Sequence, residues 1–367
     1  MNFIYRLIWS EEQQAFVAAC ELARGRGKRG RCGALLAALV VLGCLSSPQL
    51  SQAQTVASTA LPTNGQVASG TATMVQSGNS LTIQQTTQKL VTNWDTFNIG
   101  SNSTVTFNQP NSASVALNRV SGGDPSYIFG HLNANGQVYL LNPLGVVFGA
   151  GSQVNVGGLV ASSLNLSDSN FLAGNTRFIN EGSTGTVSNA GTIQTASGGY
   201  VAFMAPRVEN TGTIRTPQGT TLLGAADQVS LNFSGDKLIN YTIDKGAFNA
   251  QVTNRGVIQA DDGVVVLTAQ AADALTRSVV NQSGLIQANS LTSKGGRILL
   301  EGDDITLSTN SQTNAIGATG GGRSARGRRL ARQWGISTSH PHHPGAGRTH
   351  RCQCHTVRQG WHGRVVE

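Results

Sequence analysis

Short strands separated by turns dominate the hydrophobic pattern in the middle of the chain. Apolar or alternating stretches recur at residues 81–83, 105–107, 138–141, 146–148, 201–203, 264–267 and 297–300. Gly, Asn, Ser and other turn-forming residues separate them. Helical periodicity is weak throughout, and residues 269–275 are the best candidate for a helix. The pattern therefore predicts an all-β domain.

One sequence phrase recurs four times, starting at Asn189, Asn210, Asn254 and Asn281, each time with a Gly and then an aliphatic residue. The spacings are 21, 44 and 27 residues, and the second is close to twice the first. A unit of about twenty residues with one turn cannot bury its own apolar face, so copies have to stack. Asn suits such a turn because it tolerates left-handed backbone and can form amide ladders between copies.

This repeat favours a parallel β-helix, because sandwiches and barrels need no repeat in sequence. At about 21 residues per coil, residues 54–322 would form about 12 or 13 coils and a stack about 60 Å long. Val, Ile and Leu would line its interior. Each end of the stack would expose a sheet edge and would need a cap.

Charge divides the chain into three regions. Residues 1–53 contain six Lys/Arg and three Asp/Glu, residues 54–322 eleven and fourteen, and residues 323–367 nine and one. The net charge of +8 therefore comes from the two ends, and the region expected to fold is slightly acidic. We expect no nucleic-acid partner, although a basic chain would ordinarily suggest one.

Cysteine and histidine follow the same division. Cys20, Cys32 and Cys44 precede residue 54, Cys352 and Cys354 lie near the end, and His131 is the one His between residues 54 and 322. The middle region is therefore neither held by disulfides nor a cysteine metal site. We expect no metal and no cofactor there.

The first 53 residues have the pattern of a signal peptide. An apolar run at residues 33–45 follows a basic stretch at residues 24–31. The run is too short to span a bilayer, which needs about twenty residues. Small residues at Ser51 and Ala53 predict cleavage by signal peptidase between Ala53 and Gln54. The alternative is a lipoprotein signal at residues 41–44, which would lipidate Cys44.

Residues for catalysis are sparse. A β-helix can be a polysaccharide lyase or hydrolase, which needs carboxylates gathered on one face. The paired carboxylates of the middle region are Asp261-Asp262 and Asp303-Asp304, each beside a Gly. Neighbours on a strand point to opposite faces, so neither pair forms a converging dyad, and His131 is interpreted as a turn or surface residue. We expect a non-enzyme; a carbohydrate-binding or polysaccharide-cleaving β-helix is the alternative.

Three segments, residues 118–126, 134–149 and 157–164, resemble the N-terminal secretion domain of filamentous-haemagglutinin-type exoproteins, and the resemblance continues at residues 295–303. It covers about residues 60–322. Residues 1–9 and 21–28 resemble the extended signal-peptide region of very large exported proteins of Gram-negative bacteria. The resemblance implies a right-handed parallel β-helix with a capped N-terminal end.

The same resemblance implies export by two-partner secretion. The general secretion machinery and signal peptidase would act first, and the periplasmic docking domains of a dedicated outer-membrane transporter would then bind the secretion domain. The exported protein would be secreted or held at the cell surface. Adhesion to host or neighbouring cells would reside in a region C-terminal to residue 322.

Two short motifs carry the expected secretion site. Asn142-Pro143-Leu144-Gly145 matches the Asn-Pro-Asn-Gly motif of that family except at Leu144, and Asn118 and Arg119 lie in the first of the matching segments. Pro143 fixes its φ angle and Gly145 permits a positive one, so the motif predicts a rigid turn. The turn is needed either for the fold or for contact with the transporter.

The composition changes abruptly after Gly322. At face value, residues 323–367 suggest a nucleic-acid arm and a His/Cys metal tract around Cys352 and Cys354. A one-base shift of the reading frame, with one codon choice per residue, turns residues 326–335 and 351–356 into phrases typical of the same exoprotein family. We therefore expect a frameshifted, disordered tail without function, on a truncated exoprotein.

Overall fold

The computed structural model describes residues 56–317, except 235–236, 274 and 291–295, and the backbone of three further strands. The chain forms two units, residues 1–55 and 56–367. In the first unit, β1 (Tyr5–Ser10) pairs antiparallel with β2 (Ala15–Cys20). The predictions for Cys44, for cleavage between Ala53 and Gln54, and for residues 328–367 lie outside the described residues.

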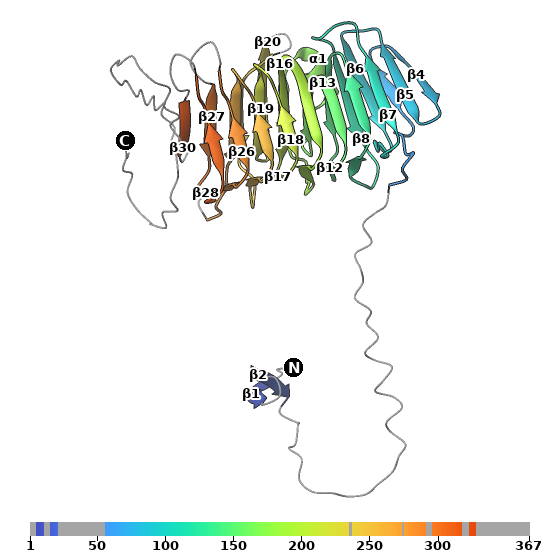
Figure 1. Cartoon of the computed structure of the whole chain (residues 1–367). Helices are drawn as coiled ribbons and strands as arrows, with labels where there is room; N and C mark the ends of the chain where they lie inside the picture. Colours follow the sequence, from blue (N-terminus) through green and yellow to red (C-terminus); the bar gives the residue numbers. More distant parts are fainter. Residues whose placement is uncertain are drawn as a thin grey trace, which may run out of the picture. The chain divides into compact units, whose positions relative to one another are not determined.

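The second unit is a parallel β-helix, in which successive coils follow one another along the stack (Figure 1). Three ladders of parallel strands form its walls. The first ladder contains β5 (Ser80–Gln85), β7 (Thr104–Asn108), β10 (His131–Ala134), β13 (Gln153–Ser162), β16 (Thr192–Ala205), β18 (Thr213–Arg215), β23 (Val257–Gln259), β26 (Leu285–Gln287) and β29 (Gln312–Asn314).

The long strands β13 and β16 continue into the second ladder. The other strands of the second ladder are β6 (Lys89–Trp94), β8 (Val115–Val120), β11 (Gln137–Leu141), β19 (Thr220–Ala225), β24 (Val264–Ala269), β27 (Arg297–Glu301) and β30 (Arg323–Gly327). The third ladder contains β9 (Ser126–Ile128), β12 (Gly145–Phe148), β15 (Thr186–Asn189), β17 (Arg207–Asn210), β22 (Gln251–Asn254), β25 (Val279–Gln282) and β28 (Asp304–Leu307).

Two antiparallel strands cap the N-terminal end of the stack. β3 (Gln66–Ser69) pairs with β6, and β4 (Ala72–Ser77) pairs with β5. This arrangement replaces an open parallel edge by a short antiparallel one, as the predicted cap requires. The strands predicted from the hydrophobic pattern are all present, and the β-helix with a capped N-terminal end is confirmed.

The predicted number of coils is wrong. The first and second ladders each contain nine strands in the described part of the chain, which gives nine coils rather than 12 or 13. The spacing of 44 residues between Asn210 and Asn254 covers a single coil, because β17 pairs directly with β22. The additional residues of that coil leave the β-helix as an insertion.

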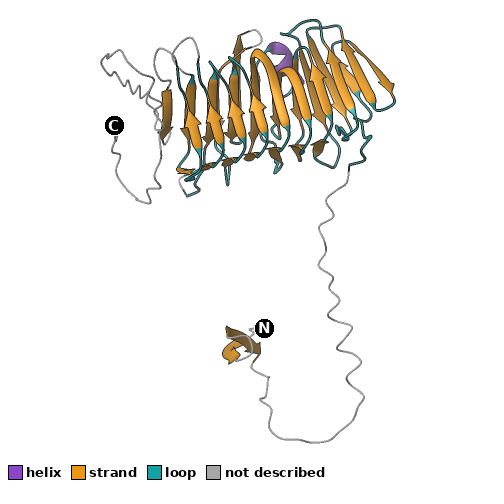
Figure 2. Ribbon diagram, in the orientation of Figure 1, coloured by secondary structure: helices purple, strands orange, loops and turns teal. Residues whose placement is uncertain are grey.

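Two such insertions cover the outer side of the second ladder. The first (residues 163–185) contains α1 (Asp168–Ala173) and β14 (Thr176–Ile179). The second (residues 226–250) contains β20 (Gln228–Ser234) and β21 (Lys237–Lys245). β14, β20 and β21 form a three-stranded antiparallel sheet. Figure 2 shows α1 beside the stacked strands.

The helix expected at residues 269–275 is wrong, and the helix of the described residues is α1. Ala269 ends β24, and the described residues after it form a bridge and bends. α1 begins at Ser167, whose side chain accepts a hydrogen bond from the backbone N–H of Asn170, and ends at Gly174 with φ of 79°. It has only six residues, so it shows no periodicity in sequence. None of the helices in the described residues is long and apolar enough to cross a membrane.

Hydrophobic side chains are buried on both sides of the second ladder. One cluster fills the interior of the β-helix with columns such as Ala161, Phe203, Leu223 and Leu267. A second cluster lies between the outer side of this ladder and the two insertions. Burial on both faces explains why residues 138–141 of β11 are apolar without alternation and are all buried.

Buried side-chain amides form a row, the amide ladder, along the inner side of the third strand ladder. The Nδ2 of Asn189 donates to Asn210 Oδ1 over 2.8 Å, and the Nδ2 of Asn210 donates to Asn254 Oδ1 over 2.7 Å. Asn254 then donates to Gln282 Oε1 over 2.7 Å. The amide ladder is therefore confirmed, but its fourth member is Gln282, whereas the sequence phrase pointed to Asn281.

The repeated Gly residues allow successive coils to approach closely. A Cβ on Gly256 would lie 2.1 Å from the carbonyl oxygen of Gly212, and one on Gly212 would lie 2.2 Å from that of Gly191. None of these Gly residues, and none of the ladder Asn residues, has a positive φ angle. The repeated sequence therefore needs Gly for the close approach of coils and Asn for amide pairing. The expected left-handed backbone at Asn is wrong.

The parallel sheet continues beyond the predicted domain end at residue 322. The backbone of β30 pairs in parallel register with β27, from Arg323 opposite Arg297 to Gly327 opposite Glu301. For these five residues the structure has a strand where disorder was expected. Any strand can pair with the exposed edge of a parallel sheet through backbone hydrogen bonds. The basic composition of residues 323–327 therefore did not exclude a strand there.

The amide ladder predicts a specific loss of stability. Asn210→Ala leaves the amides of Asn189 and Asn254 buried without their partner, which should lower the free energy of unfolding by about 2–4 kcal/mol. Asn232→Ala, at an exposed position of β20, is the matched control and should change it by less than about 0.5 kcal/mol. Urea unfolding followed by circular dichroism measures both; equal effects would contradict a stabilising ladder.

Candidate functional site

Asn118 lies inside the β-helix and serves the fold. Its side chain is fully buried, and its Oδ1 accepts a hydrogen bond of 3.0 Å from the indole N–H of Trp94. Its Nδ2 donates to the carbonyl oxygens of Ala116 and Tyr139 over 3.2 and 3.3 Å. All of its polar atoms are thus occupied within the chain, and no atom remains for a partner.

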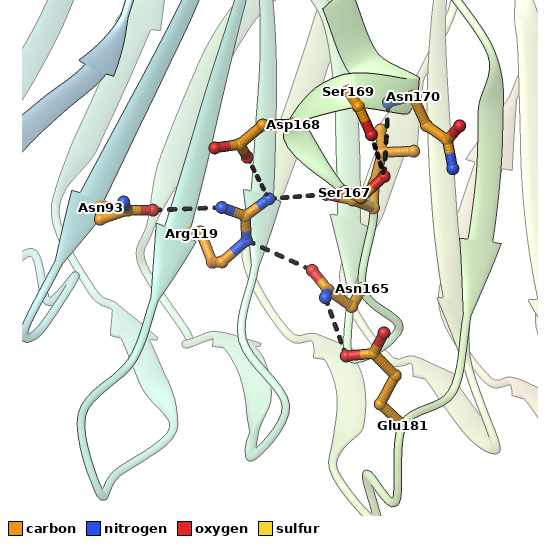
Figure 3. A network of polar contacts seen from close by, with 9 residues as sticks. Asn93, Arg119, Asn165, Ser167, Asp168, Ser169, Asn170 and Glu181 are labelled. Carbon is orange, nitrogen blue, oxygen red and sulfur yellow. Dashed lines mark hydrogen bonds and ion pairs between the residues drawn. The ribbon is translucent and has the colours of Figure 1, made fainter.

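Arg119 points to the opposite side and fastens the first insertion to the β-helix. Its guanidinium donates to Asn165 Oδ1, Asn93 Oδ1 and the carbonyl oxygen of Leu166 over 3.2, 3.2 and 2.6 Å. It also forms an ion pair of 2.7 Å with Asp168, the first residue of α1 (Figure 3). Only 22% of this side chain is exposed, so most of it is withdrawn from solvent.

A second cation holds the other end of α1. Lys89 Nζ donates to the carbonyl oxygens of Phe171 and Leu172 over 3.0 and 2.8 Å. It also lies 5.6 Å from the centroid of the Phe171 ring. Cations are favourable near the carbonyl end of a helix, although α1 is short. Arg119 and Lys89 together fix the position of the first insertion.

The motif at residues 142–145 forms the predicted turn. Asn142 is buried; its Nδ2 donates to Ser126 Oγ and to the carbonyl oxygen of Asp124, both over 3.0 Å. Its Oδ1 accepts from the backbone N–H of Leu144 over 2.9 Å, and its carbonyl accepts from that of Gly145 over 2.8 Å. Gly145 has φ of 111°, which L-residues with side chains rarely adopt.

Leu144, where this chain departs from the family motif, is a surface residue with 41% of its area exposed. The turn needs only its backbone. Asn142 therefore supports the interpretation that the motif serves the fold, while Pro143 and Leu144 remain exposed on the surface.

Both motifs meet at one pocket. Its volume is about 240 Å³, and Arg119 and Pro143 lie on its walls. The first insertion contributes five lining residues: Ser163, Leu164, Asn165, Glu181 and Ser183. The other lining residues are Val120, Ser121 and Leu141. Sequence reasoning found Arg119 and Pro143 but missed the residues of the insertion.

The turn and the insertion are bonded to each other beside this pocket. The carbonyl oxygen of Pro143 accepts hydrogen bonds from the hydroxyl of Ser183 and, over 3.2 Å, from the backbone N–H of Gly185. A Cβ on Gly185 would lie 2.4 Å from the backbone nitrogen of Gly145. We call this region, made of residues 119–121, 141–145 and 163–185, the recognition corner.

The paired carboxylates lie outside the recognition corner: Asp261 and Asp262 are in a turn, Asp303 is in a bend, and Asp304 begins β28. Asp261 accepts from the side chain of Gln259 and from the backbone N–H of Asn289, and Asp262 occupies a turn with φ of 59°. Asp303 accepts from the hydroxyl of Ser278 over 3.0 Å, and Asp304 pairs with Arg277.

His131 is the first residue of β10, in a strand rather than a turn. Among the described residues, no three His, Cys, Asp or Glu side chains are grouped as metal ligands would be.

The fold and the signal peptide define the secretion domain of an exported exoprotein. The sequence matches the TPS (two-partner secretion) secretion domain family over residues 53–315 and the extended signal peptide of the type V secretion system over residues 1–50. The chain belongs to the TPS secretion domain family. It is exported by the two-partner pathway to the extracellular space or cell surface, and its secretion domain is recognised by a cognate outer-membrane transporter.

Solved and curated relatives agree with this assignment. The crystal structure of the HMW1 secretion domain from Haemophilus influenzae is 29% identical, with a TM-score of 0.62 over 72% of this chain and 76% of that chain. Two heme/hemopexin-binding proteins of Haemophilus influenzae are 35% and 29% identical over 260 and 273 residues. The match spans less than a third of their length, 28% and 29%. The carbohydrate-directed alternative is not favoured.

The Arg119 contacts predict a local effect. Arg119→Lys keeps the charge but cannot reach Asn93, Asn165 and Leu166 at once, so the first insertion should loosen and the domain should lose about 1–3 kcal/mol. Hydrogen exchange of residues 164–175 should become faster. Arg255→Lys is the control, because the Arg255–Glu209 pair is exposed and should matter little. Unchanged exchange in Arg119→Lys would contradict the fastening role.

The turn predicts a contrast between two adjacent positions. Asn142→Ala removes the buried amide that holds both sides of the turn and should lower stability by about 1–3 kcal/mol. Leu144→Ala should change it by less than about 0.5 kcal/mol, since this side chain is a surface residue. Thermal unfolding measures the stability of both variants. A larger loss of stability in Leu144→Ala than in Asn142→Ala would refute the assigned roles.

Proposed function

We propose that the recognition corner is the surface to which the periplasmic docking domains of the transporter bind. The observation that carries this proposal is that the two sequence motifs, more than twenty residues apart, line one pocket. Asn118 and Asn142 are buried and hold this surface in shape, whereas Pro143, Leu144 and Glu181 are exposed on it. In this proposal the motifs mostly hold the surface in shape, and the first insertion supplies the contacts to the docking domains.

The export steps that precede docking are proposed from the signal-peptide pattern of residues 1–53. The general secretion machinery exports the chain, and signal peptidase cleaves between Ala53 and Gln54. The mature protein then begins twelve residues before β3, the first strand of the N-terminal cap. Lipidation at Cys44 is the alternative.

The domain is proposed to be a targeting element and not an enzyme. Its paired carboxylates are occupied by turn contacts and an ion pair, and the buried Tyr139 has a pKa raised by desolvation, which keeps it protonated. The names of the curated relatives suggest binding of heme or hemopexin. Adhesion to host or neighbouring cells is the other candidate. We assign either activity to a region C-terminal to residue 322.

Secretion itself is directly testable. The full chain, produced in a transporter-deficient Gram-negative host together with the cognate transporter, should appear in the culture medium. With a transporter that lacks its periplasmic docking domains, it should remain in the periplasm. Immunoblots of medium and periplasm measure both. Retention despite an intact transporter that exports its own known partner would contradict the proposal.

A further inference from the structure

The pocket in the recognition corner has the size of a socket for one side chain. Pockets for small molecules usually have about 300–1,000 Å³, whereas this one has about 240 Å³. Val120, Leu141 and Leu164 are buried and give it apolar walls. Such walls suit the aliphatic stem of a long side chain whose polar end remains near the rim.

The charge at the pocket favours a cation. Arg119 and Glu181 are the charged residues among those that line it. The guanidinium of Arg119 is already engaged by Asp168 and by three oxygen acceptors. Glu181 is exposed, and its Oε2 accepts a single hydrogen bond of 2.9 Å from Asn165. The balance of these charges is therefore negative, and Glu181 is the acidic group that a ligand would meet.

A buried hydroxyl is also available. Ser163 lines the pocket, is 1% exposed, and its Oγ has no hydrogen-bond partner among the described residues. Buried hydroxyls are nearly always hydrogen-bonded in folded proteins. This oxygen is an acceptor for an N–H donor that enters the pocket.

We propose that this pocket binds one Arg or Lys side chain of the transporter's periplasmic docking domain, with its cationic end at Glu181. The inference rests on the proposed docking surface and names its chemistry. Apolar walls accommodate the stem, Glu181 supplies the counter-charge, and Ser163 supplies an acceptor. An anionic partner does not fit, because the one cation that lines the pocket is already neutralised.

The test measures binding of the chain, purified from periplasm, to the soluble periplasmic docking domains of its transporter. Glu181→Gln keeps an oxygen that can accept from Asn165 but removes the charge, and it should weaken binding about tenfold at low salt. The matched control is Asp262→Asn, which removes one exposed carboxylate from a different turn and should change the affinity less than twofold. At about 1 M salt the difference should shrink, because the Debye length is then about 3 Å.

A second variant and a rescue identify the partner group. Ser121→Leu places a larger side chain at the exposed rim of the pocket and should also weaken binding. Glu181→Gln and Ser121→Leu should both keep the thermal unfolding midpoint of the unmodified chain. Glu181→Arg should bind still more weakly. Replacing the docking domain's exposed Arg and Lys residues by Glu, one at a time, should restore its binding at one position.

The outcomes separate the two proposals. Wild-type affinity in Glu181→Gln, or no rescue at any position, overturns the basic-side-chain inference while leaving the docking surface intact. If the unmodified chain does not bind the docking domains at all, the proposed docking function fails, and this inference fails with it.

Discussion

The axial stacking of parallel strands is the constraint on which the rest of this structure depends. Each coil is bonded almost entirely to the coils before and after it, so one register shift would displace every later turn. Amide pairing from Asn189 to Gln282 and the close approach of Gly212 and Gly256 fix that register. Because the coils stay in register, turns from successive coils are aligned and build one surface.

The recognition corner is a consequence of this alignment and of one insertion. The turn at residues 142–145 lies in one coil and residues 163–185 leave the next, so they are neighbours in space. Arg119 and Lys89 hold α1 against the outer side of the second ladder, where the second hydrophobic cluster is buried. The insertion is thus a fixed part of the domain, able to form one wall of a pocket with the turn.

Much of the fold could be predicted from sequence, and the site only in part. Strand positions, the β-helix and the amide ladder follow from local hydrophobic periodicity and from the repeated Asn. The coil number was wrong because residues 163–185 and 226–250 add length without adding a coil. The apolar run at residues 138–141 predicted a strand, but not that the two insertions cover its outer side. Glu181 and Ser163 carry no motif, since their role arises only from tertiary contacts.

Docking of the transporter at the recognition corner is the step that links this fold to export. The most direct measurement is hydrogen exchange of the full chain with and without these domains at saturating concentration. Docking at the recognition corner predicts protection concentrated in residues 119–121, 141–145 and 163–185. Protection confined to the cap strand β4, or to the exposed face of the first ladder, would contradict it.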